Sequence, residues 1–206
     1  MPAERKRPWY LVFALLGAML LGTTGACGGW RSVSQYRETI DPLIAQGVSD
    51  PADRAAIESR VDAYVRALDA AKARGWPLAV ATLLLGVAMM VFSLRTLGGN
   101  RSARAVLVQL VVAQAAVNAL SFWLLPDVSE AELRLLDAIQ AADIHVRVTD
   151  RVQADETGRT TAKVLRVAKP IVLALSTLGS ALVVVALTRR RAREFFDPSA
   201  AALPER

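Results

Sequence analysis

Residues 77–94 have the sequence PLAVATLLLGVAMMVFSL and contain no charged side chain. An α-helix rises about 1.5 Å per residue, so a stretch of this length nearly crosses the roughly 30 Å hydrocarbon layer of a bilayer. Three further stretches, 8–30, 105–126 and 170–188, also lack charged residues. A soluble helix of this length would carry charges on its exposed face. The four stretches therefore predict four membrane-spanning helices and exclude an ordinary soluble enzyme.

The predicted fold class is an all-α membrane protein, a four-transmembrane-helix bundle with two extracytoplasmic, mostly helical loops. Only helices and closed barrels satisfy backbone hydrogen bonds in lipid, and the stretches lack the alternation of barrel strands. Pro170 is expected to begin the fourth helix. The predicted segments are an N-terminal tail (1–8), a first span (9–29), a first loop (30–75), a second span (76–94), a short connection (95–104), a third span (105–125), a second loop (126–169), a fourth span (170–188) and a C-terminal tail (189–206).

Basic residues predict the orientation. The tails and the short connection hold 11 Lys and Arg against 4 Asp and Glu, whereas the long loops hold 14 against 15. Cytoplasmic segments carry the excess of Lys and Arg, so both termini are expected in the cytoplasm. Arg outnumbers Lys by 21 to 4, which is typical of bacteria with G- and C-rich genomes, so we expect a bacterial inner membrane. Anionic lipid head groups are the expected partners of Arg189, Arg190, Arg191 and Arg193, and no nucleic-acid partner is expected.

Cys27 is the one cysteine of the sequence, so no intrachain disulfide is expected. The residues before it also fit a lipoprotein signal: a basic start, an apolar stretch at 11–22 and small residues at 24–26. Thr24 stands where such signals usually have Leu. We expect an uncleaved first span, and lipidation at Cys27 with three remaining spans is the alternative.

Apolar stripes with helical spacing run along the first loop. The main stripe consists of Ile57, Val61, Tyr64, Leu68 and Ala71, and a shorter one of Val33, Tyr36, Ile40 and Ile44. Asp50 and Pro51 suit the beginning of the longer helix. Stripes this narrow must be buried, and we expect burial against the second loop rather than against a partner protein.

The second loop is expected to begin with a helix. Ser129 and Glu132 have the spacing of a capping box, and the predicted helix ends near Ala142. Its expected apolar face consists of Leu133, Leu136 and Ile139.

Residues 143–167 allow two interpretations. Residues 144–148 alternate between apolar and polar side chains, as in a strand of a β-hairpin, but Ile144, Val148 and Val152 also fit a helix. The helix is slightly favoured because an isolated hairpin is marginal in water.

Small and polar residues predict the faces on which the spans pack, because lipid gives little apolar driving force between helices. The expected packing residues, span by span, are Ala14, Ala18, Gly22, Gly25 and Gly29; Thr82, Gly86, Met89 and Ser93; Gln114, Asn118 and Ser121; and Ala174, Thr177 and Ala181, with Ser176 and Ser180 beside them. Amides at mid-membrane are costly unless they are hydrogen-bonded. We expect Gln114, Asn118 and Ser121 to join helices, and the lining of a substrate or water path is the alternative.

The sequence offers no motif for catalysis. No ionisable residue lies in a predicted span, which argues against a proton-coupled transporter, a voltage sensor and an intramembrane protease. No catalytic residue, cofactor or metal site is expected, and His145 has no Ser or Cys nucleophile near it in sequence. The predicted function is that of a non-catalytic integral inner-membrane protein with a structural or interaction role, in which the outer loops contact a partner or each other. A protein partner or a homo-oligomer is the expected assembly. A homo-oligomeric channel or small transporter subunit is the alternative.

Overall fold

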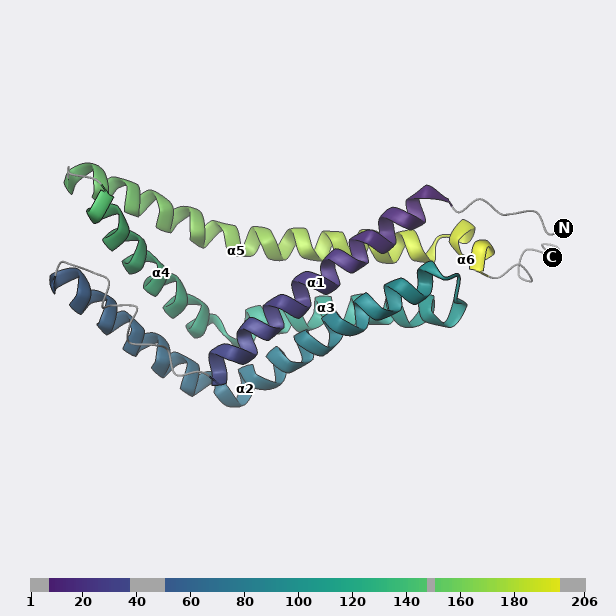
Figure 1. Cartoon of the computed structure of the whole chain (residues 1–206), viewed down its shortest axis with the longest axis horizontal. Coiled ribbons are helices and arrows are strands. Elements are labelled where there is room, and N and C mark those ends of the chain that lie inside the picture. The colour runs from purple at the N-terminus through teal and green to yellow at the C-terminus, as the bar shows by residue number, and fades with distance from the viewer. Residues whose placement is uncertain (1–7, 38–50, 148–150, 197–206) are drawn as a thin grey trace. The chain divides into compact units, whose positions relative to one another are not determined.

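A computed structural model describes residues 8–37, 51–147 and 151–196; at residues 52, 53, 140–147, 151–166, 169, 191, 193 and 194 it describes the backbone alone. The helices are α1 (Trp9–Arg37), α2 (Pro51–Leu97), α3 (Arg101–Leu124), α4 (Pro126–Arg147), α5 (Arg151–Thr188) and α6 (Arg190–Phe196) (Figure 1). These ranges contain no strand, so the prediction of an all-α protein is confirmed for them.

The helices form two compact units. The first consists of Met1–Arg31, Ala79–Ala119 and Ala174–Arg206, and the second of Ser32–Leu78 and Leu120–Leu173. We call them the apolar unit and the polar unit. Four of the helices, α1, α2, α3 and α5, contribute residues to both.

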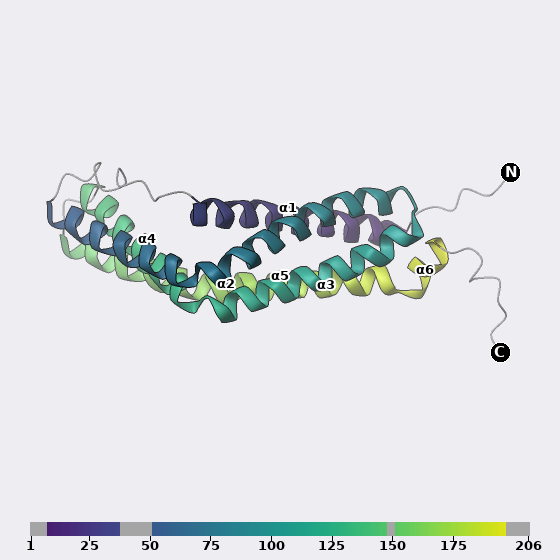
Figure 2. The same ribbon diagram turned by 90° about the horizontal axis from the view of Figure 1, so that it is seen from below.

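Four helices are long and apolar enough to cross a membrane, as the sequence predicts. They comprise Trp9–Arg37, Arg54–Leu97, Arg101–Leu124 and Pro170–Thr188. Their segments in the apolar unit run alongside one another (Figure 2). The core between them contains Leu11, Leu15 and Ala18 of α1, Met89 of α2, Leu107 and Val111 of α3, and Val183 and Leu187 of α5.

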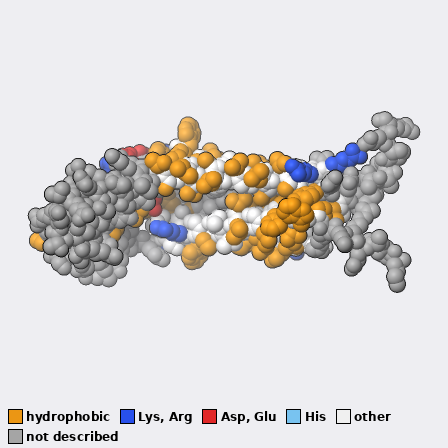
Figure 3. Space-filling model, turned by 90° about the horizontal axis from the view of Figure 1, so that it is seen from above, with side chains coloured by type: hydrophobic (Ala, Val, Ile, Leu, Met, Phe, Trp, Pro, Cys, Tyr) orange, Lys and Arg blue, Asp and Glu red, His pale blue; other side chains and the backbone are white. Residues whose placement is uncertain are grey.

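The outside of these helices is as apolar as their core. Exposed large side chains include Phe13, Leu20, Leu84, Val91, Val112, Leu178 and Leu182. Figure 3 shows apolar side chains gathered along one face of the helices. An exposed apolar surface of this extent is unfavourable in water and suits lipid. The helices therefore have the composition of a multi-pass membrane protein inside and out.

The core of the polar unit joins the main stripe of the first loop to α4. Ile57, Tyr64 and Leu68 are buried in one cluster with Leu135 of α4, which confirms the predicted stripe and its burial within the chain. The expected face of α4 is only partly right: Ile139 packs against this cluster, whereas Leu133 and Leu136 are not among the residues that form it or pack against it. The packed face instead contains Val128, Ala131, Leu135, Ala138 and Ile139. Two of these residues are alanines, so a search for the most apolar face of the helix overlooks the face that packs.

Two predicted helix starts are wrong. The first turn of α4 begins at Pro126 and Asp127, and the Ser129 N–H already donates to the Leu125 carbonyl at 3.1 Å. Pro126 needs no N–H partner and Asp127 suits the positive end of the helix dipole, so these two residues begin the helix ahead of the capping-box spacing. Pro170 lies inside α5, which begins at Arg151.

The hairpin alternative for residues 143–167 is also wrong wherever the structure describes them. Residues 143–147 belong to α4 and residues 151–167 to α5, and residues 148–150 lie outside the described ranges. A helix satisfies its own backbone hydrogen bonds, whereas a lone hairpin has no third strand or core to stabilise it. The shorter stripe of the first loop is described only to Arg37: Val33 is buried and Tyr36 partly buried, both on α1, and Ile40 and Ile44 lie outside.

Candidate functional site

A close helix contact in the apolar unit joins α1 to α2 through glycines. A Cβ added at Gly86 would lie 2.4 Å from the Ala26 nitrogen and 2.7 Å from the Gly22 carbonyl oxygen. A Cβ at Gly29 would lie 2.4 Å from the Leu83 nitrogen. Backbone thus meets backbone, which only glycine permits at these positions. The predicted packing faces of the first two spans are confirmed, with Ala18, Met89 and Ser93 fully buried.

Gln114 is the most buried amide of this contact region. Its side chain is 3% exposed and lies against α1, where a Cβ at Gly25 would be 3.2 Å from Gln114 Nε2. Nε2 donates to Asn118 Oδ1 at 3.1 Å. The other end, Oε1, is buried and has no hydrogen-bond partner in the described part of the chain. The amide therefore packs between helices with one acceptor unused.

The structure places the three predicted polar residues of α3 on one continuous stripe. Ala103, Leu107, Val111 and Gln114 are its buried members, and Asn118 and Ser121 follow at steps of four and three residues. Asn118 is partly buried, and Ser121 belongs to the polar unit. Only Gln114 and Asn118 are brought together by a direct bond.

The predicted packing face of the fourth span is wrong. Ala174, Thr177 and Ala181 are exposed, whereas Ser180, Val183 and Leu187 are buried. Ser180 Oγ donates to the Ser176 carbonyl at 2.9 Å, so its hydroxyl is satisfied within its own helix. A serine whose hydroxyl is bonded within its own helix packs like a small apolar residue. The packed face of this span therefore includes Ser180, which the prediction had placed beside the face.

The arginine-rich C-terminal segment folds against the apolar unit as α6. Ala192 and Phe196 are buried in its core, and the Arg104 guanidinium carbon lies 5.5 Å from the centroid of the Phe196 ring. Arg104 Nη1 also donates to the Leu187 carbonyl at 3.4 Å. Arg189 and Arg190 are exposed, and the side chains of Arg191 and Arg193 lie outside the described ones. The pair Phe195–Phe196 is the sequence feature that could have indicated this docking.

Cys27, the candidate for lipidation, is an exposed thiol on α1. It lies between two residues that contact α2, because Ala26 meets Gly86 and Gly29 meets Leu83. Cleavage before Cys27 would cut this contact in two.

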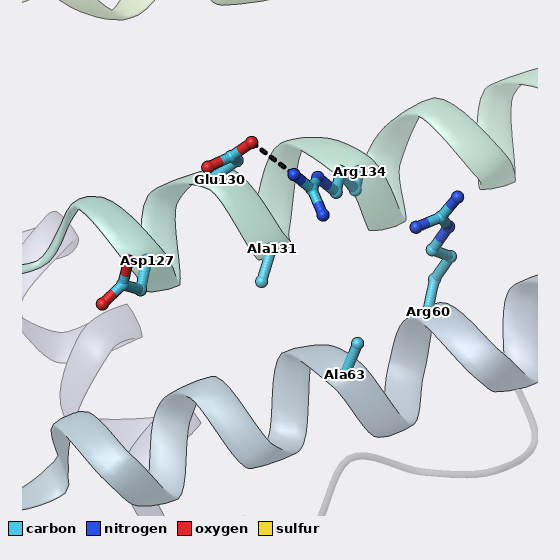
Figure 4. A pocket seen from close by; sticks show the side chains of 6 residues that line it. All are labelled: Arg60, Ala63, Asp127, Glu130, Ala131 and Arg134. Carbon is cyan, nitrogen blue, oxygen red and sulfur yellow. Dashed lines mark hydrogen bonds and ion pairs between the residues drawn. The ribbon is translucent and has the colours of Figure 1, made fainter.

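A groove between α2 and α4 in the polar unit is lined by charged side chains and alanines. It has a volume of about 250 Å³ and is lined by Arg60, Ala63, Asp127, Glu130, Ala131 and Arg134. Figure 4 shows Ala63 and Ala131 pointing toward each other across the gap, with the charged side chains around them. Arg134 Nη2 and Glu130 Oε1 form an ion pair along one face of α4. The groove could not be predicted from the sequence, because nothing in the sequence indicates that Ala63 of one helix faces Ala131 of another.

The described residues contain no group of three or more His, Cys, Asp or Glu that could hold a metal ion. Among the described side chains, burial raises the pKa of Tyr36. The side chain of His145 lies outside the described ones.

Comparisons with protein-family models, with curated proteins and with solved structures find no match to this chain.

Proposed function

We propose that the protein is a non-catalytic inner-membrane protein with a structural or interaction role, in which the apolar unit anchors the polar unit for contact with a partner. The observation that carries the proposal is the location of the exposed large apolar side chains. Among the described residues they lie on α1, on residues 84–94 of α2, on α3 and on residues 167–185 of α5, and none lies on residues 54–78 or 126–139. Residues 54–78 of α2 and 126–139 of α4 thus present a surface for water, whereas the apolar helix segments present a surface for lipid.

The orientation proposed for this protein has both termini in the cytoplasm. Its support is the excess of Lys and Arg in the tails and in the short connection between α2 and α3. Two single-cysteine variants test it in the Cys27→Ser background: Asp69→Cys on α2 and Ser102→Cys on α3. In intact bacteria a membrane-impermeant maleimide is expected to label the first and to reach the second only after the membrane is opened. The reverse pattern, or a chain that stays soluble without detergent, would contradict the proposal.

Contact with a partner is expected at the polar groove. The apolar face of α4 and that of residues 54–78 of α2 already cover each other, so no exposed large apolar side chain is left for a partner on residues 54–78 or 126–139. The groove offers two basic and two acidic side chains around a gap made by alanines. A partner of mixed charge, or a second copy of the chain, would complement it.

Filling the groove tests this contact. Ala63→Trp places an indole in the gap, and Ala56→Trp is the matched control because Ala56 is exposed on the same helix and does not line the groove. A protein or second copy cross-linked to the wild type should be retained by the control and lost from Ala63→Trp, with both variants showing the same helical content. A strict monomer with no co-isolating protein in mild detergent would count against an interaction role.

A homo-oligomeric channel or transporter subunit is the second candidate function. The observation that favours it is the unused Gln114 Oε1, which water or a neighbouring subunit would satisfy. Asn118→Leu is then expected to abolish transport and leave assembly intact. Loss of assembly instead would identify the amides as packing groups.

A further inference from the structure

A second cavity of the polar unit differs in chemistry from the groove. It has a volume of about 460 Å³, opens to the surface, and is lined by Tyr36, Arg37, Lys72, Ala73, Trp76 and Pro77. Arg37 and Lys72 are both exposed cations, and no acidic residue lines the cavity in the part of the chain that the structure describes. The cavity is therefore positively charged on one side and apolar on the other.

An aromatic contact positions one of the two cations, Arg37. The Arg37 guanidinium carbon lies 5.7 Å from the centroid of the Trp76 ring, within the range of a cation–π contact. A guanidinium stacked in this way keeps its N–H groups at the edge, where they can bind an anion. The Tyr36 hydroxyl lies against Gly75, since a Cβ at Gly75 would meet it. The burial that raises the pKa of Tyr36 keeps the phenol protonated and therefore a hydrogen-bond donor.

The cavity lies where the uncharged stretch of α2 begins. Lys72 and Arg74 precede Trp76 and Pro77, and no charge follows until Arg95. Tryptophan at such a point favours the level of the lipid head groups, with acyl chains on one side and water on the other. A ligand with a phosphate and an apolar tail would meet Lys72 and Arg37 with the first and Trp76 and Pro77 with the second.

We propose that this cavity binds the phosphate of an anionic phospholipid, held by Arg37, Lys72 and the Tyr36 hydroxyl, with the first part of an acyl chain along Trp76 and Pro77. The site is separate from the C-terminal arginines. It rests on the membrane placement proposed above, which the maleimide labelling tests independently. If labelling places the chain in the membrane and no lipid selectivity is found, only the present inference fails.

The experiment uses the full chain in mild detergent with added phosphatidylglycerol, and counts retained lipids by native mass spectrometry. The test variant carries Arg37→Gln with Lys72→Gln. The control carries Arg31→Gln with Arg74→Gln, which removes the same charge from the same two helices at exposed residues that do not line the cavity. The test variant should retain phosphatidylglycerol about tenfold or more weakly, since a basic residue near the lipid surface contributes about fivefold. The control should stay near the wild type.

Three outcomes would overturn the proposal. Equal losses in the two double variants would identify general attraction to the basic surface. Equal retention of phosphatidylcholine would show that no anion is recognised. Displacement of the lipid by millimolar inorganic phosphate would identify a site for a free anion. Gly75→Ala provides a second measurement that keeps both cations, because its Cβ displaces Tyr36; weaker lipid retention with unchanged helical content is expected.

Discussion

Gly86→Ala should loosen the packing of α1 on α2. In the present arrangement the new Cβ would lie 2.4 Å from the Ala26 nitrogen, 2.7 Å from the Gly22 oxygen and 2.9 Å from the Ala26 Cα, whereas ordinary contacts begin at 3.4 Å. All three neighbours are backbone atoms, so no side chain can rotate away. The helices must separate by about 1 Å, which forfeits a quarter to a half of each dispersion contact along the seam.

The expected magnitude follows from two opposing effects. Overpacking of a well-packed core costs about 1–3 kcal/mol, and a clash with backbone belongs at the upper end. Alanine recovers up to about 1 kcal/mol relative to glycine through its helix propensity. The net loss should be about 2 kcal/mol. Gly28→Ala on α1 is the matched control, because its Cβ would meet nothing within 4 Å and only the propensity gain remains.

The assay is unfolding of the purified protein in mixed micelles of mild detergent and SDS, followed by circular dichroism. Gly86→Ala should unfold at a lower SDS fraction than the wild type, and Gly28→Ala at the same or a higher fraction. If the two variants unfold together, the close approach of α1 and α2 is not what holds the helices, and the reasoning fails.

Three further predictions concern other parts of the chain. Leu135→Ala should destabilise the polar unit by about 2–5 kcal/mol, because Leu135 is buried with Ile57, Tyr64 and Leu68. Proteolysis within α4 should then be faster, and an unchanged rate of cleavage would contradict the packing of α4 on α2. Gln114→Leu should change the free energy of unfolding by about 1 kcal/mol or less, because it removes both the hydrogen bond to Asn118 and an unpartnered oxygen. A large loss of stability in the same SDS assay would show that Gln114 Oε1 has a partner. Burial raises the pKa of Tyr36 above its ordinary value of 10.0, so the unfolded chain loses the phenol proton first as pH rises. The free energy of unfolding should therefore fall above about pH 10, and Tyr36→Phe should remove the contribution of this residue to that fall when unfolding is measured against pH.

The four apolar helices could be predicted because the absence of charge over a full span is a property of the local sequence. The main stripe of the first loop was equally local: Ile57, Tyr64 and Leu68 recur at helical spacing, and the structure buries them. The glycine positions were found for the same reason, since Gly22, Gly29 and Gly86 stand on regular faces of long helices. Each of these features follows from chain geometry alone, whatever the partner helix is.

Tertiary contacts decided the features that depend on which helices meet. The packed face of α4 contains Ala131 and Ala138, and that of α5 contains Ser180, because a partner helix selects a face by fit as well as by hydrophobicity. Residues 143–147 alternate as a strand would, yet they continue α4, since a helix needs no second segment to satisfy its backbone. Pro170 marks the end of the charged region in the sequence, but it lies within α5. The groove at Ala63 and the cavity at Arg37 and Lys72 are formed by residues far apart in the sequence, and no spacing along one helix could place them together.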